Sequence, residues 1–403
     1  MSWVWMSWGG TLLFYRVRWL LWRSFRSGEP LHGHLLRLVR RHPHKQCVVE
    51  VESGRSLTFA QFNAHANAYA HLFSKNLNIG VLCYIYTSGT TGAPKAAVIR
   101  HYRFYLMGMG CGMAFGIRAS DRIYLTLPMY HSAGGILGTS QVIVRGCTAC
   151  IRTKFSATNF WKDCTRFECT VSQYIEIFQL NFFFTFWLLL GNGLRPQIWR
   201  DFVQRFGIAK IGEFYGSTEG NSNLLNIDNR PGACGFIPIY RSLDRFFPLQ
   251  LLKVDAKSGE LLRDERGFCI KCVPGDTGEL VGAIRNDPLS RFEGYVDESD
   301  TQKKLIRNCQ SAGDQVFSTG DVLHWDRLGY LYFKDRCGDT YRWRGENVST
   351  TEVEGVLQPL RAILDATVYG VQVPGREGRA GMIALTMVDG TDEEVIDRSA
   401  GAI

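Results

Sequence analysis

The chain has 403 residues, of which 45% are hydrophobic and 21% are charged, a composition typical of a globular protein with room for two or three domains. Its formal net charge is +8, and no aromatic-interleaved basic stripe accompanies that charge, which argues against nucleic acid as a partner. The twelve cysteines are scattered, with close pairs only at Cys147/Cys150 and Cys269/Cys272. We expect reduced thiols facing the cytosol, with a zinc site from these pairs as the alternative.

Residues 1–30 mix tryptophans and arginines, among them Trp19, Trp22 and Arg23. The apolar part is shorter than the roughly 20 residues that a membrane span needs. Indole rings and arginines suit the bilayer interface, where the rings lie at headgroup level and the cations meet anionic lipid. We therefore expect a membrane-associating segment, with a buried helix as the alternative.

Two helices are expected next. Leucines and arginines at helical spacing predict the first over Leu31–Arg41. Thr58 and Gln61 have the spacing of a capping box, which predicts that the second helix begins there and continues to about Phe73.

An apolar strand, Val81–Tyr86, leads directly into a loop that is rich in hydroxyls and glycine and ends in a lysine. Glycines let the backbone approach an anion closely, hydroxyls and freed N–H groups can donate to it, and a lysine supplies a mobile charge. The loop is not a Walker A sequence, because no Gly-Lys-Ser/Thr closes it. A polar turn between two strands is the alternative. The residues expected to bind phosphates are Thr87, Ser88, Gly89, Thr90, Thr91, Gly92 and Lys95.

The rest of the chain alternates strands and turns. Strands are expected over Gln141–Arg145, Thr148–Arg152, Ala366–Val373 and Met382–Val388, a strand followed by a turn and a helix start over Asp121–Gly135, and a β-rich section over Gly278–Tyr332. The aromatic run Asn181–Leu190 is too short to span a bilayer. It leaves a buried helix and an aberrant splice junction as open interpretations.

Three further runs complete the pattern: Gly212–Asn221 (GEFYGSTEGN), Ser318–Val322 (STGDV) and Asp335–Glu354. With the phosphate loop they resemble the adenylate-forming superfamily, and most closely the fatty-acid transport protein/very-long-chain acyl-CoA synthetase family. The resemblance implies an α/β adenylate-forming fold. A large AMP-binding N-terminal domain of mixed sheets and helices would cover residues 31–336, and a small, truncated α+β C-terminal domain would cover residues 337–403.

The resemblance also implies roles for individual residues. Thr218, Glu219 and Lys95 would be catalytic, and Thr87 and Glu219 would hold Mg²⁺, a cation that prefers hard oxygen ligands. Tyr215, Gly191 and Asn192 would contact adenine, Asp321 and Arg336 the ribose, and Thr218 the α-phosphate; His131 would form a wall of the acyl site, and Gly338 would be the domain hinge.

Simpler interpretations remain for three of these residues. Glu219 by itself is compatible with a solvated turn, Asp321 with a turn aspartate that binds its own backbone, and His131 with a packed structural histidine.

The implied function is a long-chain or very-long-chain fatty acid–CoA ligase that uses ATP, Mg²⁺ and CoA and is coupled to fatty-acid uptake. We expect a membrane-associated protein whose catalytic part faces the cytosol, at the endoplasmic reticulum or plasma membrane, with the peroxisome as an alternative; a homo-oligomer stays open. Two departures from the family pattern stand out: a block is lacking before residue 81, and the family's C-terminal catalytic lysine has no counterpart. The rival interpretations are a catalytically inactive fatty-acid or nucleotide binder at the membrane, a truncated isoform or partial gene product, and an ATP-hydrolysing transporter subunit.

Overall fold

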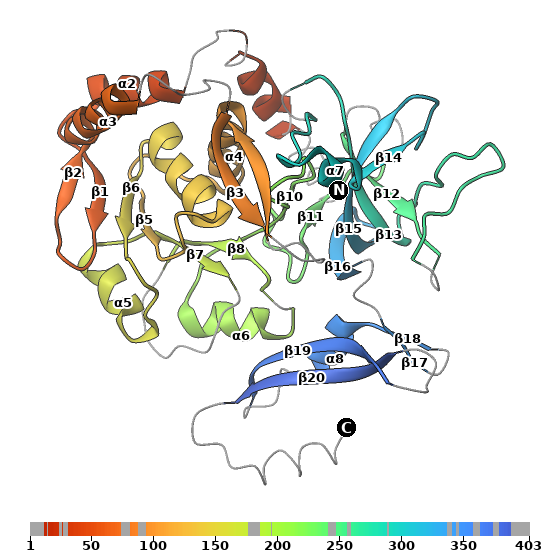
Figure 1. The fold of residues 1–403 in the computed structure, drawn as a ribbon. Coiled ribbons are helices and arrows are strands. Elements are labelled where there is room, and N and C mark those ends of the chain that lie inside the picture. Colours follow the sequence, from red (N-terminus) through yellow and green to blue (C-terminus); the bar gives the residue numbers. More distant parts are fainter. Residues whose placement is uncertain are drawn as a thin grey trace. The chain divides into compact units, whose positions relative to one another are not determined.

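Short apolar strands alternate with amphipathic helices along the chain, as an α/β fold requires. The computed structural model describes residues 12–13, 15–23, 26, 31–73, 81–87, 94–175, 186–194, 196–240, 247–255, 259–287, 290–336, 341–343, 346–357, 363–373 and 379–387. Besides the helical residues 15–23, the described helices are α2 (Leu31–Arg41), α3 (Phe59–Phe73), α4 (His101–Phe115), η1 (Ser132–Gly138), η2 (Gln141–Arg145), α5 (Ala157–Arg166), α6 (Pro196–Phe206), α7 (Glu298–Gln302) and α8 (Thr350–Leu357). Figure 1 shows the fold coloured along the sequence, from red at the N-terminus to blue at the C-terminus.

Within the described residues, the strands fall into five sheets. The largest has the order β10 (Leu224–Leu225), β9 (Ile211–Tyr215), β8 (Leu188–Asn192), β7 (Val171–Ile175), β5 (Arg122–Leu125), β6 (Thr148–Ile151), β1 (Gln46–Glu50), β2 (Ser56–Thr58). A six-stranded sheet has the order β11 (Gly235–Phe236), β16 (Tyr330–Arg336), β15 (Gln315–Trp325), β13 (Thr277–Ala283), β12 (Leu249–Lys253), and β14 (Leu305–Arg307) pairs with β15. The three pairs are β3 (Val81–Thr87) with β4 (Lys95–Arg100), β17 (Tyr341–Trp343) with β18 (Glu346–Val348), and β19 (Ile363–Gln372) with β20 (Arg379–Met387).

The largest sheet is parallel from β9 to β1 and is buried on both faces. Strand β5 shows why its sequence is apolar at consecutive positions. Ile123 and Leu125 pack into a core with α2, α3 and α4, whereas Tyr124 between them packs into a second core with α5 and α6. Since side chains alternate across a strand, each face of the sheet receives its own helical cover.

Parallel strands bring their carboxyl ends to one edge, where ligands of open α/β sheets bind. Strand β8 ends at Asn192 and β9 ends at Tyr215. Their register pairs Gly191 with Glu213. The two segments that were expected to contact adenine therefore lie side by side at this edge.

Several local predictions are confirmed. Helices α2 and α3 have the expected bounds. The capping box at the start of α3 is present, because the Gln61 amide donates to Thr58 Oγ1 at 3.2 Å and the Thr58 amide donates to Gln61 Oε1 at 2.9 Å.

The expected strand over Gln141–Arg145 is wrong, because these residues form the π-helix η2. Its β-branched residues favour a strand locally. However, Val142 packs with Cys111 and Phe115 of α4, so tertiary packing overrides the local preference. In the run Asn181–Leu190, the described residues are not helical: Leu188–Asn192 is the buried strand β8, and residues 181–185 lie outside the described part.

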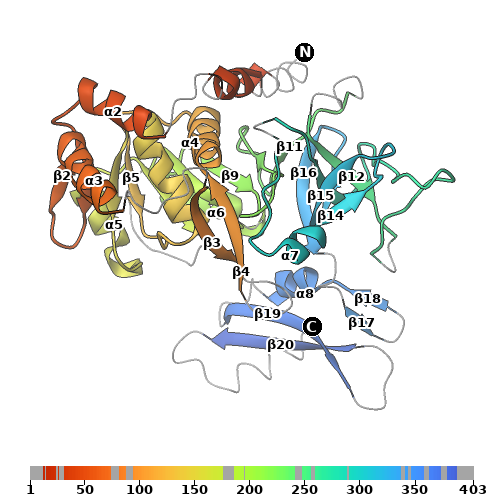
Figure 2. The same cartoon turned by 45° about the horizontal axis from the view of Figure 1, so that its top comes forward.

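The chain divides into two compact units. The first comprises Met1–Gln250, Val281–Thr319 and Arg327–Leu331, and the second comprises Leu251–Leu280, Gly320–Asp326 and Tyr332–Ile403. The first contains the large sheet and the β3–β4 hairpin, which Figure 2 shows from another side. The second contains the β19–β20 pair, on which α8 and Tyr341 pack through Leu357, Ala366 and Val368.

Candidate functional site

The hairpin of β3 and β4 carries both ends of the predicted phosphate loop. Thr87, the last residue of β3, pairs directly with Lys95, the first residue of β4. The Thr87 hydroxyl also donates to the Lys95 carbonyl at 3.4 Å. The structure thus brings Thr87 and Lys95 together; Ser88, Gly89, Thr90, Thr91 and Gly92 lie outside the described residues.

The turn after β9 carries Thr218 and Glu219. Thr218 Oγ1 lies 3.2 Å from Ser132 Oγ, at the start of helix η1. Glu219 is only 8% exposed, so it is not the solvated turn residue of the simpler interpretation.

Tyr295 connects the two predicted magnesium ligands. Its hydroxyl lies close enough to the Glu219 carboxylate and the Thr87 hydroxyl for both to affect its pKa. Burial and then the charge of Glu219 raise the pKa of Tyr295 above its ordinary value, so its hydroxyl keeps its proton. The hairpin and the turn after β9 therefore converge on one side chain.

Lys95 lies beside the same tyrosine. Its Nζ is 5.7 Å from the centre of the Tyr295 ring and 3.0 Å from Asp300 Oδ1. Because Lys303 also contacts Asp300, at 2.9 Å, this carboxylate has two cationic partners.

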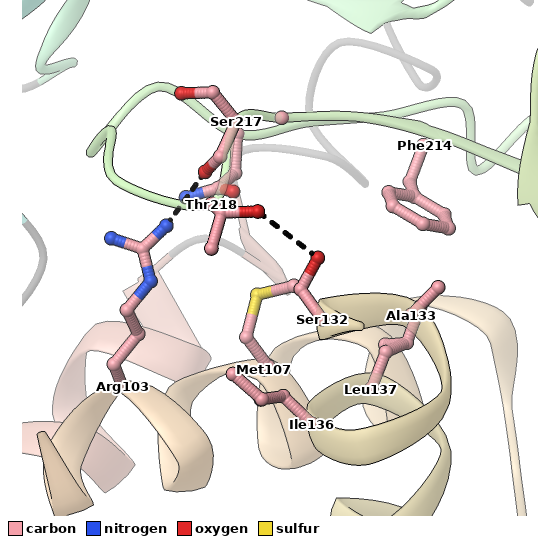
Figure 3. A pocket seen from close by; sticks show the side chains of 11 residues that line it. Arg103, Met107, Ser132, Ala133, Ile136, Leu137, Phe214, Ser217 and Thr218 are labelled. Atoms are coloured by element: carbon pink, nitrogen blue, oxygen red, sulfur yellow. Dashed lines mark hydrogen bonds between the residues drawn. The ribbon is translucent and has the colours of Figure 1, made fainter. Parts of the chain in front are cut away.

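A small cavity of about 30 Å³ lies beside the Thr218 turn (Figure 3). Helices α4 and η1 and strand β9 supply its mainly apolar lining, which includes Met107, Ile136, Leu137 and Phe214. One cation lines it as well: Arg103, which is 7% exposed and donates from Nη2 to the Ser217 carbonyl at 2.8 Å.

Arg103 is a buried charge that acidic neighbours compensate. Burial lowers the pKa of its guanidinium, whereas Tyr102, Glu219 and Glu293 raise it. The arginine therefore contributes positive potential beside the carboxylate of Glu219.

Glu213 is a second buried acid of the site. Its Oε1 accepts a bond from the Gly193 amide at 2.6 Å, and its Oε2 accepts one from the Tyr174 hydroxyl. Burial raises the pKa of Glu213 to about 7, although these bonds partly oppose the shift. Glu213 holds Tyr174 and Gly193 together at the end of β8.

The predicted adenine-side residues lie at the strand ends. Asn192 is exposed, Tyr215 is partly buried, and Gly191 faces Tyr174 so closely that an added Cβ would lie 2.2 Å from the Tyr174 carbonyl oxygen. His131 is exposed and caps helix η1, because its Nδ1 accepts a bond from the Ala133 amide at 3.2 Å. That bond fits the structural interpretation of His131.

Asp321 and Arg336 belong to the second unit, where Arg336 Nε lies 3.2 Å from Asp321 Oδ1. The structure thus brings the two predicted ribose residues together. Gly338 lies outside the described residues.

Sequence reasoning missed Arg103, Glu213, Tyr295 and Asp300. Arg103 and Ser217 are separated by 114 positions, so no local spacing signals their contact. Glu213 is the second residue of the GEFYGSTEGN run, so it is the one residue of the four that lies within a recognised motif.

The donors present suit a magnesium–nucleotide complex. Glu219 and Thr87 offer hard oxygen atoms around one hydroxyl, and Lys95 offers a charge at the same place. Across the described residues, no group of three or more His, Cys, Asp or Glu side chains is arranged to hold a metal ion, which leaves the zinc alternative at Cys147/Cys150 and Cys269/Cys272 unsupported there. All the cysteines in that part of the chain are free thiols.

No helix within the described ranges has the length and apolar character needed to cross a membrane. The expected membrane contact of residues 1–30 concerns the bilayer surface, a different kind of contact from a span.

Comparison with known proteins identifies a family match and several similar relatives. Residues 80–282 match the family described as AMP-binding enzyme. Long-chain fatty acid transport protein 1 of Homo sapiens is 51% identical over 315 residues, which cover 75% of this chain and 48% of that protein. Long-chain fatty acid transport protein 2 of Rattus norvegicus is 42% identical over 315 residues, covering 75% of this chain and 50% of that protein. The chain spans about half the length of the curated relatives it matches.

Solved structures share the fold at low sequence identity. O-succinylbenzoate coenzyme A synthetase of Bacillus subtilis, in complex with ATP and magnesium ion, has a TM-score of 0.65 at 18% identity and covers 93% of each chain. ATP-bound MatB of Rhodopseudomonas palustris has a TM-score of 0.59 at 21% identity, covering 87% of this chain and 67% of that one. The fold is thus that of adenylate-forming enzymes, and by the match over residues 80–282 the chain belongs to the AMP-binding enzyme family.

Proposed function

We propose that the chain is a long-chain or very-long-chain fatty acid–CoA ligase. It would activate the acid with ATP to acyl-AMP and then transfer the acyl group to CoA. The observation that carries this proposal is the convergence of Thr87, Lys95 and Glu219 around Tyr295. The similarity to long-chain fatty acid transport proteins supports the substrate class.

A carboxylate needs activation because its oxide is a poor leaving group. In the first half-reaction a carboxylate oxygen attacks the α-phosphorus of ATP, the bond to the bridging oxygen breaks, and pyrophosphate leaves with the electron pair. In the second, the thiolate of CoA attacks the acyl carbon and AMP leaves. Both steps move negative charge onto phosphate oxygens, which preorganised donors and cations stabilise.

The residues divide that work by position. Lys95 would contact the outer phosphates together with the loop residues Ser88–Gly92, and Thr218 would donate to the α-phosphate. Glu219 and Thr87 would hold Mg²⁺, which when bound neutralises charge on the departing pyrophosphate. His131 would form a wall of the acyl site.

The nucleoside would be bound by other strand ends. Tyr215, Gly191 and Asn192 would surround adenine, and Asp321 has two acceptor oxygens for the ribose hydroxyls, with Arg336 beside it. We also keep Gly338 as the proposed hinge between domains 31–336 and 337–403, since a glycine can absorb a large change in backbone angles.

The cavity beside Thr218 supports an apolar acyl substrate. Met107, Ile136, Leu137 and Phe214 offer it an apolar lining, and Arg103 and Ser132 supply polar groups at the same cavity. Apolar walls with a few polar groups are typical of small-molecule sites. At about 30 Å³ the cavity is too small for a long chain, so we propose that its side chains move apart when the acid enters.

The N-terminal segment supports contact with a membrane surface. In the helical residues 15–23, Val17 and Leu21 pack against Tyr105 of α4, whereas Trp19 and Trp22 are 53% and 49% exposed. Arg23 lies over the Trp19 ring at 5.6 Å. An outward face of tryptophan and arginine suits an anionic bilayer interface. We propose that it keeps the enzyme beside its substrate and couples ligation to uptake, because the CoA ester is trapped on the cytosolic side.

The decisive experiment is ATP–pyrophosphate exchange by the purified protein with a panel of fatty acids. We expect exchange that depends on the acid and is abolished by Lys95→Ala and by Glu219→Ala. Lys162→Ala, an exposed lysine of α5, is the matched control and should keep wild-type exchange. Unchanged exchange in both site variants would overturn the residue assignment.

Trapping with hydroxylamine separates the ligase from its main rival. An acyl-AMP gives an acyl hydroxamate, so hydroxamate formation supports ligation. Bound fatty acid without any hydroxamate would instead identify an inactive fatty-acid or nucleotide binder.

A further inference from the structure

Residues 291–300 lie along the outer edge of strand β4, whose first residue is Lys95. The Val98 amide donates to the Gly294 carbonyl at 3.1 Å, and the Val296 amide donates to the Ala96 carbonyl at 2.9 Å. We call residues 291–300 the edge segment. Its bonds to β4 place Tyr295 opposite Ala97 in an antiparallel bridge.

The backbone of Tyr295 is also fixed from its other side. Thr301 Oγ1 accepts a bond from the Tyr295 amide at 2.9 Å and donates one to the Tyr295 carbonyl at 3.3 Å. Gly294, with φ +67°, makes the turn that permits this contact, because an added Cβ would lie 2.5 Å from Thr301 Cγ2. Tyr295 therefore has little freedom to shift along the strand.

An ion pair holds the start of the edge segment to the hairpin, and a hydrogen bond holds it to α4. Arg100, the last residue of β4, pairs with Glu293, and Arg291 Nε lies 2.6 Å from the same carboxylate. The Tyr102 hydroxyl donates to Glu293 at 3.3 Å. The Glu293 side chain is only 6% exposed, so solvent screens these contacts weakly.

The side chains of the edge segment point at the proposed nucleotide site. The ring of Tyr295 lies 5.7 Å from Lys95 Nζ, and its hydroxyl is close enough to Thr87 and Glu219 for both to affect its pKa. Asp300 Oδ1 lies 3.0 Å from the same Nζ. Thr87, Lys95 and Glu219, three of the residues expected to meet magnesium triphosphate, thus lie beside this segment.

We propose that Tyr295 is a positioning residue that sets the separation of Thr87 and Glu219 for a divalent cation bound to nucleotide triphosphate. This inference rests on the proposed function for the identity of the site. Groups that orient ligands without touching the cation commonly set its affinity, because a ligand that must first be oriented pays that cost on binding. A tyrosine held at its backbone from two sides is a rigid spacer for two oxygen ligands that come from different parts of the chain.

The test is Tyr295→Phe, which removes the hydroxyl and keeps the ring beside Lys95. Binding of a fluorescent ATP analogue is titrated with and without Mg²⁺. We expect the magnesium-dependent gain in affinity to fall on the order of tenfold to a hundredfold, while binding without Mg²⁺ stays at the wild-type level. An unchanged magnesium-dependent gain would overturn the inference.

Tyr330→Phe is the matched control, because the Tyr330 hydroxyl also bonds a carboxylate, Asp228 Oδ2 at 2.9 Å, away from the edge segment. It should keep the full magnesium-dependent gain. A second pair of variants covers the case in which Tyr295→Phe does not fold: Thr301→Val removes the backbone contacts of Tyr295 and should share its defect, whereas Thr301→Ser keeps the hydroxyl and should bind as wild type. A normal gain in Thr301→Val would count against the inference.

A readout without nucleotide separates this inference from the proposed function. Hydrogen exchange at β3 and β4 should be faster in Tyr295→Phe than in wild type and Tyr330→Phe, because the hairpin loses a tether. If the wild type binds Mg²⁺–ATP but gives no fatty-acid-dependent exchange of pyrophosphate, the ligase proposal fails and the role of Tyr295 stands. If exchange of pyrophosphate proceeds and Tyr295→Phe binds magnesium normally, the role of Tyr295 fails alone.

Discussion

Arg103 of helix α4 donates to the main-chain oxygen of Ser217 at 2.8 Å and so joins the helix after the phosphate hairpin to the turn that carries Glu219. Figure 3 shows this bond beside the contact of Ser132 with Thr218. The turn that supplies two of the proposed catalytic residues, Thr218 and Glu219, is thereby tied to helix α4 by a buried side chain.

Replacing Arg103 with methionine should destabilise the protein. The variant removes the buried cation beside Glu219, whereas Glu293 keeps its ion pairs with Arg100 and Arg291. Leaving a buried carboxylate without its cation costs about 3 kcal/mol or more of the free energy of unfolding. Urea denaturation measures the loss. Arg327→Met, at an exposed position, should change the free energy of unfolding by less than about 0.5 kcal/mol. Equal free energies of unfolding for the two variants would show that the charge of Arg103 does not stabilise the folded protein.

Glu213 should make the stability of the protein depend on pH. Its pKa is about 7 in the folded protein against an ordinary 4.5, so the folded state binds the proton more tightly than the unfolded state. The stabilisation is fully present below pH 4.5, falls as pH rises and is lost above about pH 7, a change of about 3 kcal/mol. Urea denaturation at a series of pH values should show this slope in the wild type and a flatter one in Glu213→Gln. Exposed Glu265→Gln is the control, and a slope that survives in Glu213→Gln would contradict the prediction.

Two glycine-to-alanine variants should have opposite effects. At Gly191 the new methyl group meets the Tyr174 carbonyl at 2.2 Å, which we expect to cost about 1–3 kcal/mol of stability through strain. At Gly110, inside helix α4, a Cβ meets nothing within 4 Å, and alanine should add about 0.5–1 kcal/mol through its higher helix propensity. Thermal unfolding of both variants checks the signs, and a stabilised Gly191→Ala would mean that β7 and β8 separate easily.

Asp321→Ala should weaken recognition of the ribose more than it changes stability. Arg336, the partner of Asp321, has a side chain that is 60% exposed, so the ion pair itself contributes about 1 kcal/mol or less. Bonds from the carboxylate to the ribose hydroxyls are stronger, and their loss should raise the KM for ATP on the order of tenfold or more. The wild type should prefer ATP to 3′-deoxy-ATP in pyrophosphate exchange, and the variant should lose much of that preference. A variant that still discriminates as the wild type does would remove Asp321 from the ribose site.

Local signals predicted local structure well. The capping box of Thr58 and Gln61 involves atoms three positions apart, so neighbouring sequence determines it. The strand before the phosphate loop ends at Thr87, one residue beyond its expected end. Where burial against a distant helix decides the conformation, as at Gln141–Arg145, the local preference of valine and isoleucine misled the prediction.

The site was predictable only as far as its motifs reach. Thr87, Lys95, Thr218 and Glu219 were named from two runs, and Tyr295 lies beside Lys95 of the first run and close enough to Glu219 of the second to have its pKa raised by that carboxylate. Tyr295 and Arg103 have no motif of their own, because their importance comes from contacts that the folded chain creates between remote segments. A single sequence does not show which of its distant residues contact each other in the folded protein.

Neighbouring residues on strand β5 contribute to different cores, and this arrangement has an evolutionary consequence. Whether a substitution at Tyr124 is tolerated should depend on the side chains of α5 and α6 that pack against it. Whether a substitution at Ile123 is tolerated should depend on the side chains of α2 and α4. The core residues on the two faces of the sheet can therefore diverge independently between homologues. The ends of the parallel strands can stay at the same edge of the sheet while this happens. In a deep mutational scan, tolerance along this strand should alternate between two separately co-varying groups.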